Sequence, residues 1–284
     1  MTIARADEAL RIAYWRTSMD QGRRFMDRLL EYPVAECGEP LASIEKAATC
    51  ARIEMEFSTT PIVGDIPRIF EVREGLIEPL MAVGREMNGR GWVLKIEDGF
   101  RTRDSQRTVA RQPRIFDMIL RRVSWETGSD EPDVELVVRR FSTFCANAPK
   151  VAGHMSGCAI DISVLDRDTR TEVNRGGPYL ELSELTPMAS PFTPPEALQN
   201  RALITLLMEK HGFMAYPYEF WHYSQGDVFG ESLRCTGMPG RYAAVNRDPL
   251  TGAIGPLANL MAPLNAPEDI REEIVRAHAR MRAR

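Results

Sequence analysis

Two short stretches, far apart in the chain, hold residues whose types and spacing suit metal chemistry. "GHMSGCAID" (residues 153–161) places His154 seven positions before Asp161, and "EFWHY" (residues 219–223) places Glu219 three positions before His222. The chain has only four histidines, so these stretches use half of them. Two imidazoles and one carboxylate are a suitable ligand set for a catalytic zinc that keeps one position for water. Glu219 is then free to act as a base toward that water.

Each stretch also has a simpler interpretation. The segment from Gly153 to Gly157 predicts a tight turn, and Cys158 to Leu165 predicts a strand that carries Asp161 on the face opposite Ile160 and Ile162. Because a carboxylate in an apolar strand is costly to bury unless it is paired or bound to a metal, Asp161 needs a partner. If this stretch is considered alone, the simpler interpretation is that Asp161 caps a neighbouring loop and that His154 lies at the rim of the core.

The second stretch reads equally well as a buried histidine paired with a nearby glutamate. On a regular strand Glu219 and His222 face opposite sides, so a shared site requires a bend or bulge near Glu219, which Pro217 favours. The other two histidines, His211 and His278, lie in contexts that predict structural or solvated side chains.

A third element lies upstream, in "EDGFRTRDSQ" (residues 97–106). Arg101 follows the end of a strand predicted over residues 92–97. An arginine in that place can direct a fixed positive charge into a cleft, where it stabilises an oxyanion or holds a carboxylate.

The order Asp-Gly-Phe-Arg, His-x-x-Gly-x-Ala-x-Asp and Glu-x-Trp-His-Tyr resembles the zinc D-alanyl-D-alanine dipeptidases of the vancomycin-resistance type. That family is related in fold to the hedgehog signalling domain. The resemblance covers about residues 60–230 and includes "EALQNR" and "GFMAY". It implies that His154, Asp161 and His222 bind zinc, that Glu219 is the catalytic base and that Arg101 acts beside the oxyanion.

The chain departs from the family pattern around the substrate's amino end. Ala152 stands where the family usually has a serine, and Leu180, followed by Glu181, stands where an aspartate holds the substrate ammonium. These residues, together with Trp221, are the candidate substrate pocket. The departures predict an intact metal centre with an altered pocket for a free amino terminus.

The composition is that of an ordinary globular protein. The 284 residues have a formal net charge of −4, which argues against nucleic acid as the main partner. No apolar run reaches the roughly 18 residues that cross a bilayer. The five scattered cysteines form no C-x-x-C pair and fit a reducing compartment, and the N-terminal residues lack the pattern of a signal peptide. A cytoplasmic protein is expected.

The predicted elements indicate an α+β fold, with a small antiparallel or mixed sheet flanked by helices and with added N-terminal helices and a C-terminal helix. Strands are expected at 92–97, 158–165, 213–216 and 217–223. Helices are expected at 5–31, 40–56 and 73–88, at 104–122 with a kink or break at Pro113, after Pro132, at 195–210 and from 267. We expect a helical extension over residues 1–59, a catalytic domain over 60–240 and a tail over 241–284.

The predicted function is zinc-dependent hydrolysis of an amide bond in a dipeptide or another small amino-acid-derived molecule. Two alternatives remain open at this stage. Two histidines and a carboxylate also bind iron(II) in non-haem oxygenases, and a relative of this fold can bind metal without catalysis. The expected partners are a small substrate and, through the N-terminal helices, a second copy of the chain; neither nucleic acid nor membrane is expected.

Overall fold

A five-stranded mixed sheet lies at the centre of the protein. The computed structural model describes residues 3–62, 64 and 66–283. Across the sheet the strands run in the order β2 (Met55–Phe57), β4 (Trp92–Asp98), β5 (Ala159–Asp166), β7 (His222–Ser224) and β6 (Met214–Ala215). The strands β2 and β4 are parallel, and the other neighbours are antiparallel. The expected α+β class with a small mixed sheet is confirmed.

One face of the sheet packs on a layer of helices and forms the larger core. This layer contains α2 (Ile44–Ala51), α3 (Ile77–Gly89, preceded by a 3-10 turn at Glu74–Leu76) and α8 (Pro195–Lys210). Ile160 and Ile162 of β5 point into this core, together with Leu80 of α3 and Leu207 of α8. Because side chains alternate along a strand, Asp161 lies on the opposite face. The alternation expected for this strand is therefore present.

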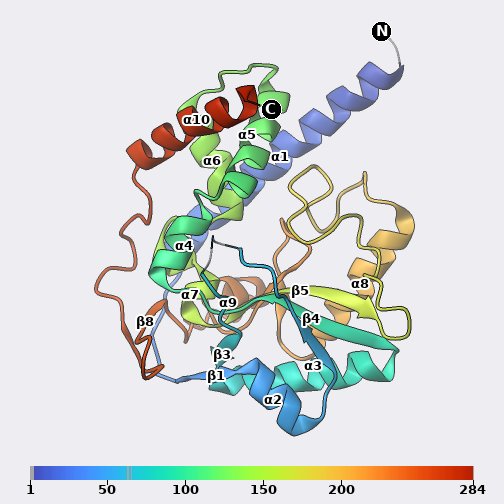
Figure 1. The fold of residues 1–284 in the computed structure, drawn as a ribbon, viewed down its shortest axis with the longest axis vertical. Coiled ribbons are helices and arrows are strands. Elements are labelled where there is room, and N and C mark those ends of the chain that lie inside the picture. Colours follow the sequence, from blue (N-terminus) through green and yellow to red (C-terminus); the bar gives the residue numbers. More distant parts are fainter. Residues whose placement is uncertain (1–2, 63, 65, 284) are drawn as a thin grey trace.

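A second helical layer covers the opposite face. It contains α1 (Ile3–Glu31), α4 (Arg103–Val109), α5 (Pro113–Thr127), α6 (Val134–Phe144) and α10 (Pro267–Arg282). Figure 1 shows α1, α5, α6 and α10 above the sheet, with α2 and α3 below it. The helix α1 is tied to this layer by a buried network, in which Trp15 and Arg140 both donate hydrogen bonds to the carboxylate of Glu126. The candidate site residues lie between the sheet and this layer.

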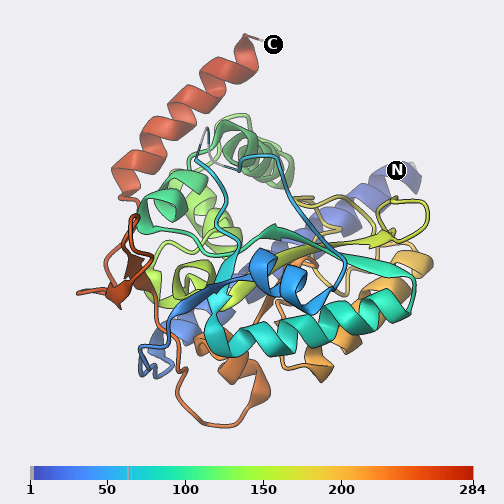
Figure 2. The same cartoon turned by 60° about the horizontal axis from the view of Figure 1, so that its bottom comes forward.

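The remaining elements are short and connect the two layers. They are the antiparallel pairs β1 (Leu41–Ser43) with β3 (Glu71–Arg73) and β8 (Val245–Arg247) with β9 (Ile254–Pro256), the 3-10 turn η2 (Pro149–Val151), and the helices α7 (Gly153–Ser156) and α9 (Val228–Arg234). Figure 2 shows α3 crossing in front of the sheet, with α10 far from it at the opposite side of the molecule. No helix in the described part of the chain is both long and apolar enough to cross a bilayer.

Three local predictions were wrong. The strand expected over residues 217–223 is only β7, because residues 217–221 form a turn before it. The helix expected over residues 40–56 is only α2, because Ser43 caps its start, Arg52 ends it in the left-handed conformation, and the flanking residues pair as β1 and β2. The turn expected at residues 153–157 is a single helical turn, α7, that ends at Gly157 with φ +73°. The division at residues 59 and 240 stays a prediction, and β2, just before the first boundary, is an edge strand of the central sheet.

Candidate metal centre

The imidazole of His154 is fixed from behind by the main chain. His154 lies on the single turn α7, immediately before β5, and is 5% exposed. Its Nδ1 atom lies 2.7 Å from the carbonyl oxygen of Gly99. Because a carbonyl oxygen only accepts hydrogen bonds, Nδ1 carries the hydrogen and Nε2 presents its lone pair. A histidine held in this way has the tautomer and orientation of a metal ligand.

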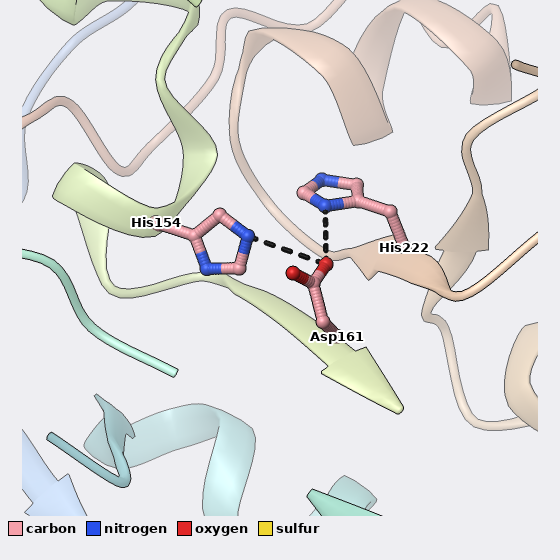
Figure 3. A group of neighbouring side chains, drawn as sticks. All are labelled: His154, Asp161 and His222. Atoms are coloured by element: carbon pink, nitrogen blue, oxygen red, sulfur yellow. Dashed lines mark hydrogen bonds and ion pairs between the residues drawn. The ribbon is translucent and has the colours of Figure 1, made fainter. Parts of the chain in front are cut away.

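Asp161 and His222 lie opposite each other on the antiparallel strands β5 and β7. Asp161 Oδ1 lies 2.9 Å from Nδ1 of His222 and 3.3 Å from Nε2 of His154, as Figure 3 shows. Burial acts to raise the pKa of Asp161, but the two imidazoles outweigh it and hold that pKa well below its usual range. The carboxylate is therefore ionised between the two rings.

The space between these three side chains suits a cation. Burial, and after it the charge of Arg101, lowers the pKa of His154 and favours the neutral ring. A neutral ring presents its Nε2 lone pair to the Asp161 oxygen at 3.3 Å, so the contact is attractive only with a cation between the two atoms, either the proton of a charged imidazole or a metal ion. One ligand atom from each of His154, Asp161 and His222 lies within 4.8 Å of the others. The donor set and its geometry fit a divalent metal.

Arg101 holds two buried carboxylates together. A shift in register between Ile96 and Asp98 brings Asp98 opposite Asp161 on the neighbouring strand. The guanidinium of Arg101 donates to Asp98 Oδ2 at 2.7 Å and to Asp161 Oδ2 at 3.3 Å. Burial acts to lower the pKa of Arg101, but these two carboxylates raise it above its ordinary value. Arg101 is thus a fixed positive charge that also orients a candidate ligand.

Tyr179 supplies a further hydrogen bond to the candidate ligand. Its hydroxyl donates to Asp161 Oδ2 at 2.9 Å. Burial and the charge of Asp161 raise the pKa of Tyr179, so that the phenol stays protonated and remains a donor. Its ring packs edge-on against Trp221, with 5.8 Å between the ring centroids. Sequence reasoning missed Tyr179, since no spacing distinguishes it from the rest of the loop that carries it.

Glu219 lies beside the candidate ligands without belonging to them. It is 7% exposed, and its Oε2 atom lies 4.0 Å from Nδ1 of His222. Burial, followed by the charge of Asp161, raises the pKa of Glu219 well above its usual range. The bend expected near Glu219 is present as a turn over residues 217–221 that leads into β7. A buried carboxyl with a raised pKa has the properties of a group that accepts and returns a proton.

A cavity joins these side chains to the helical layer. Arg101, His154, Asp161, Glu219 and His222 all line it. Its opposite wall is mainly apolar and includes Met26 and Leu29 of α1, Val109, Ile115, Phe144 and Leu182. The candidate centre therefore opens onto a space whose far end offers few charged groups.

Three of the four candidate pocket residues line this cavity. They are Ala152, Leu180 and Trp221. Leu180 has φ +67°, in the left-handed region that a branched side chain seldom adopts. The side chain of Glu181 packs instead against Gly177. Asp227, which caps α9 through Ser224 and Gly230, also lines the cavity and was missed, because nothing in its spacing links it to the two motifs.

Comparisons with known proteins show which family this chain is similar to. Residues 124–244 match the family described as D-Ala-D-Ala dipeptidase. A D-alanyl-D-alanine dipeptidase of Synechocystis sp. is 27% identical over 227 residues, which is 70% of this chain and 86% of that protein. Over this region the chain is similar to the D-Ala-D-Ala dipeptidase family. These similarities indicate a metallopeptidase-type hydrolase and favour it over the non-catalytic alternative.

Two solved structures are similar to this chain at low sequence identity. The vancomycin-resistance D,D-pentapeptidase VanY, a variant in complex with Zn(II), is 13% identical, covers 72% of this chain and 94% of its own, and has a TM-score of 0.37. The LD-carboxypeptidase LdcB is 17% identical, covers 73% and 79%, and also has a TM-score of 0.37. Nothing in these comparisons supports the iron(II) alternative.

Proposed function

We propose that the protein is a zinc-dependent hydrolase that cleaves an amide bond in a dipeptide or a similar small amino-acid-derived molecule. The observation that carries the proposal is the convergence of His154, Asp161 and His222 within 4.8 Å, next to the buried Glu219. The D-Ala-D-Ala dipeptidase family supplies the reaction class.

The three converging side chains are the proposed metal ligands. Zinc would be held by His154, Asp161 and His222, where it supplies a Lewis acid and lowers the pKa of a water molecule. The hydrogen bond to Gly99 engages Nδ1 of His154 and leaves Nε2 as the atom available for this role. Arg101 and Tyr179 hold Asp161 in place through its second oxygen.

Glu219 is the proposed general base and acid. It receives a proton from the attacking water as the C–O bond forms, and it returns that proton to the nitrogen of the leaving amine as the C–N bond breaks. Burial supports this role, because it raises the proton affinity of a carboxylate that water would otherwise stabilise. Arg101 is the proposed source of positive charge for the developing oxyanion, since it lines the same cavity.

The pocket favours a substrate whose amino end is acylated, modified or absent. Ala152 and Leu180, at the positions where the family engages an ammonium, offer neither a charge nor a side-chain hydrogen bond. Burying an ammonium against Leu180 without a partner would cost several kcal/mol. We therefore propose weak activity on free D-Ala-D-Ala and greater activity on its N-acylated counterpart. Trp221 forms part of the cavity wall. Glu181 does not line the cavity and is a weaker candidate for contact with the substrate.

Reconstitution tests this proposal. The protein is stripped of metal, loaded with zinc or, anaerobically, with iron(II), and assayed for amine release from D-Ala-D-Ala and N-acetyl-D-Ala-D-Ala. Zinc should restore turnover, faster for the acetylated substrate. Restoration by iron(II) alone, with oxygen consumption in place of hydrolysis, would contradict the zinc proposal. A clear preference for the free dipeptide would show that another acid, with Asp227 as the first candidate, binds the ammonium.

A further inference from the structure

A second cavity lies beside the candidate site, between α1 and α6. It has a volume of about 330 Å³, which is in the range of small-molecule sites. We call it the α1–α6 groove. Its walls include Met26 and Leu30 of α1, Val138 and Phe141 of α6, Met261 and Pro263 of the loop before α10.

The groove and the candidate site share part of their lining. Met26, Cys145 and Val151 border both cavities. Cys145 and Val151 lie near the two ends of the short segment that joins α6 to α7, and α7 carries His154. Met26 has an unbranched, flexible side chain between the two adjacent cavities, so a change of its rotamer can open a passage from one to the other. The groove is therefore placed to bind one end of a substrate while the amide bond of that substrate lies at the candidate metal centre.

We propose that the α1–α6 groove is a substrate subsite that binds an apolar acyl group on the amino end of the substrate. The proposal rests on the proposed function and names its substrate class, N-acylated dipeptides. Hydrolysis of the peptide bond would release an N-acyl amino acid and a free amino acid, with the hydroxyl of water on the former and its proton on the latter.

The chemistry of the groove favours an uncharged, apolar arm. The charged side chains at its edge, Arg23 and Asp27, pair with each other at 2.9 Å, and Arg23 also donates to Ser142. Neither charge is thus left to recognise a polar peptide. The rest of the lining is mainly aliphatic and aromatic, with Ser142, Asn147 and Asn265 as its uncharged polar members, and burial of methylene groups against the apolar part is favourable.

The proposal gives the N-terminal helix a role in specificity. The helix α1 contributes Met26 to both cavities, and the network of Trp15, Glu126 and Arg140 holds the helix in place. A helix of a second chain is the alternative occupant of the groove. If such a helix bound there, variants that fill the groove would change the oligomeric state of the protein.

The test uses variants that fill the groove from opposite walls. Val138→Trp fills it from α6, and Met261→Trp fills it from the loop; neither residue lines the candidate site. The matched control is Val275→Trp, since Val275 is 70% exposed on α10. The substrates are N-octanoyl-D-Ala-D-Ala and N-acetyl-D-Ala-D-Ala, assayed with the zinc-loaded full-length protein, and thermal unfolding verifies that each variant is folded.

The wild-type protein should prefer the octanoyl substrate by about tenfold or more in kcat/KM. Both filling variants should lose this preference, keep the kcat/KM for the acetyl substrate within about twofold, and run at the wild-type position in size exclusion. The control should keep the preference. An equal loss for both substrates, an unchanged preference, or a changed oligomeric state in the folded variants would overturn the proposal.

A binding measurement separates this proposal from the proposed function. Calorimetry with N-octanoyl-D-alanine compares the wild-type protein with Val138→Trp, without any need for turnover. Binding that is weakened about tenfold or more in the variant supports the subsite even if no amide is hydrolysed, in which case the proposed function alone has failed. Equal affinity in the two proteins would overturn the subsite, whatever the activity.

Discussion

Asp161 of β5 and His222 of β7 are directly paired across two antiparallel strands, with 2.9 Å between Oδ1 and Nδ1. This pairing explains how residues 61 positions apart reach one site. Because β5 is buried on both faces, its apolar side chains fix the register of the two strands. The fixed register in turn fixes the positions of Asp161 and His222 relative to each other. Changes at the site should therefore alter its chemistry more than the fold.

Glu219→Gln tests the general base. The substitution keeps the size of the side chain but removes its capacity to accept the proton, so turnover should fall about 100-fold or more. Metal content should stay at the wild-type level. The matched control is Glu78→Gln, whose side chain is 81% exposed, and it should have no effect. Wild-type turnover in a metal-replete Glu219→Gln protein would assign Glu219 a structural role.

Arg101→Ala tests the charge beside the oxyanion. Loss of one preorganised donor typically costs about 2.7–4 kcal/mol, or roughly 100- to 1000-fold in rate. We expect kcat to fall far more than KM rises. Because Arg101 also holds Asp161, metal content is measured in parallel, and Arg101→Lys should keep more of it than Arg101→Ala. A rise in KM alone would make Arg101 a clamp for a substrate carboxylate.

Tyr179→Phe isolates the hydrogen bond to Asp161. The ring and its packing on Trp221 remain, and only the hydroxyl that lies 2.9 Å from Asp161 Oδ2 is lost. Loss of such a supporting group typically weakens metal binding about 10- to 100-fold. Competition with a chelator measures this effect. Tyr32→Phe, at a partly buried tyrosine outside the site that donates to a main-chain carbonyl, should leave the affinity unchanged; equal effects would contradict the assignment.

Leu180→Asp tests the basis of substrate preference. Leu180 has the left-handed conformation, which aspartate and asparagine adopt more readily than leucine, so the variant should fold at least as well. The new carboxylate should raise kcat/KM for free D-Ala-D-Ala relative to the N-acetyl substrate. Leu180→Asn shares the conformational change without the charge and should leave the ratio unchanged. An unchanged ratio in Leu180→Asp would place the amino end elsewhere.

The sequence predicted the parts of the site that depend on local pattern. The alternation around Asp161 and the two histidine motifs were sufficient to propose the ligands, and the apolar side of β5 was placed correctly. The contribution of Asp98 was not predictable, because it depends on a register shift within β4. The wall formed by α1 was also missed, since helix amphipathicity identifies a buried face but not the partner that covers it.

The length of the second helix was overestimated for a related reason. Residues 40–56 have a composition that favours a helix, but the segment Met55–Phe57 pairs with β4, and that non-local pairing outweighs local propensity. The same limitation applies to Tyr179, whose loop has no periodic pattern and whose contact with Asp161 exists only in the folded chain.

The metal content of single-ligand variants tests the central claim most directly. Elemental analysis of the purified wild-type protein should give about one divalent ion per chain, with zinc as the main element. His154→Ala, Asp161→Ala and His222→Ala should each lose most of this metal while staying folded. His211→Ala, which changes a histidine paired with Glu86 outside the site, should retain it. Full metal occupancy in His154→Ala would contradict the proposed metal centre.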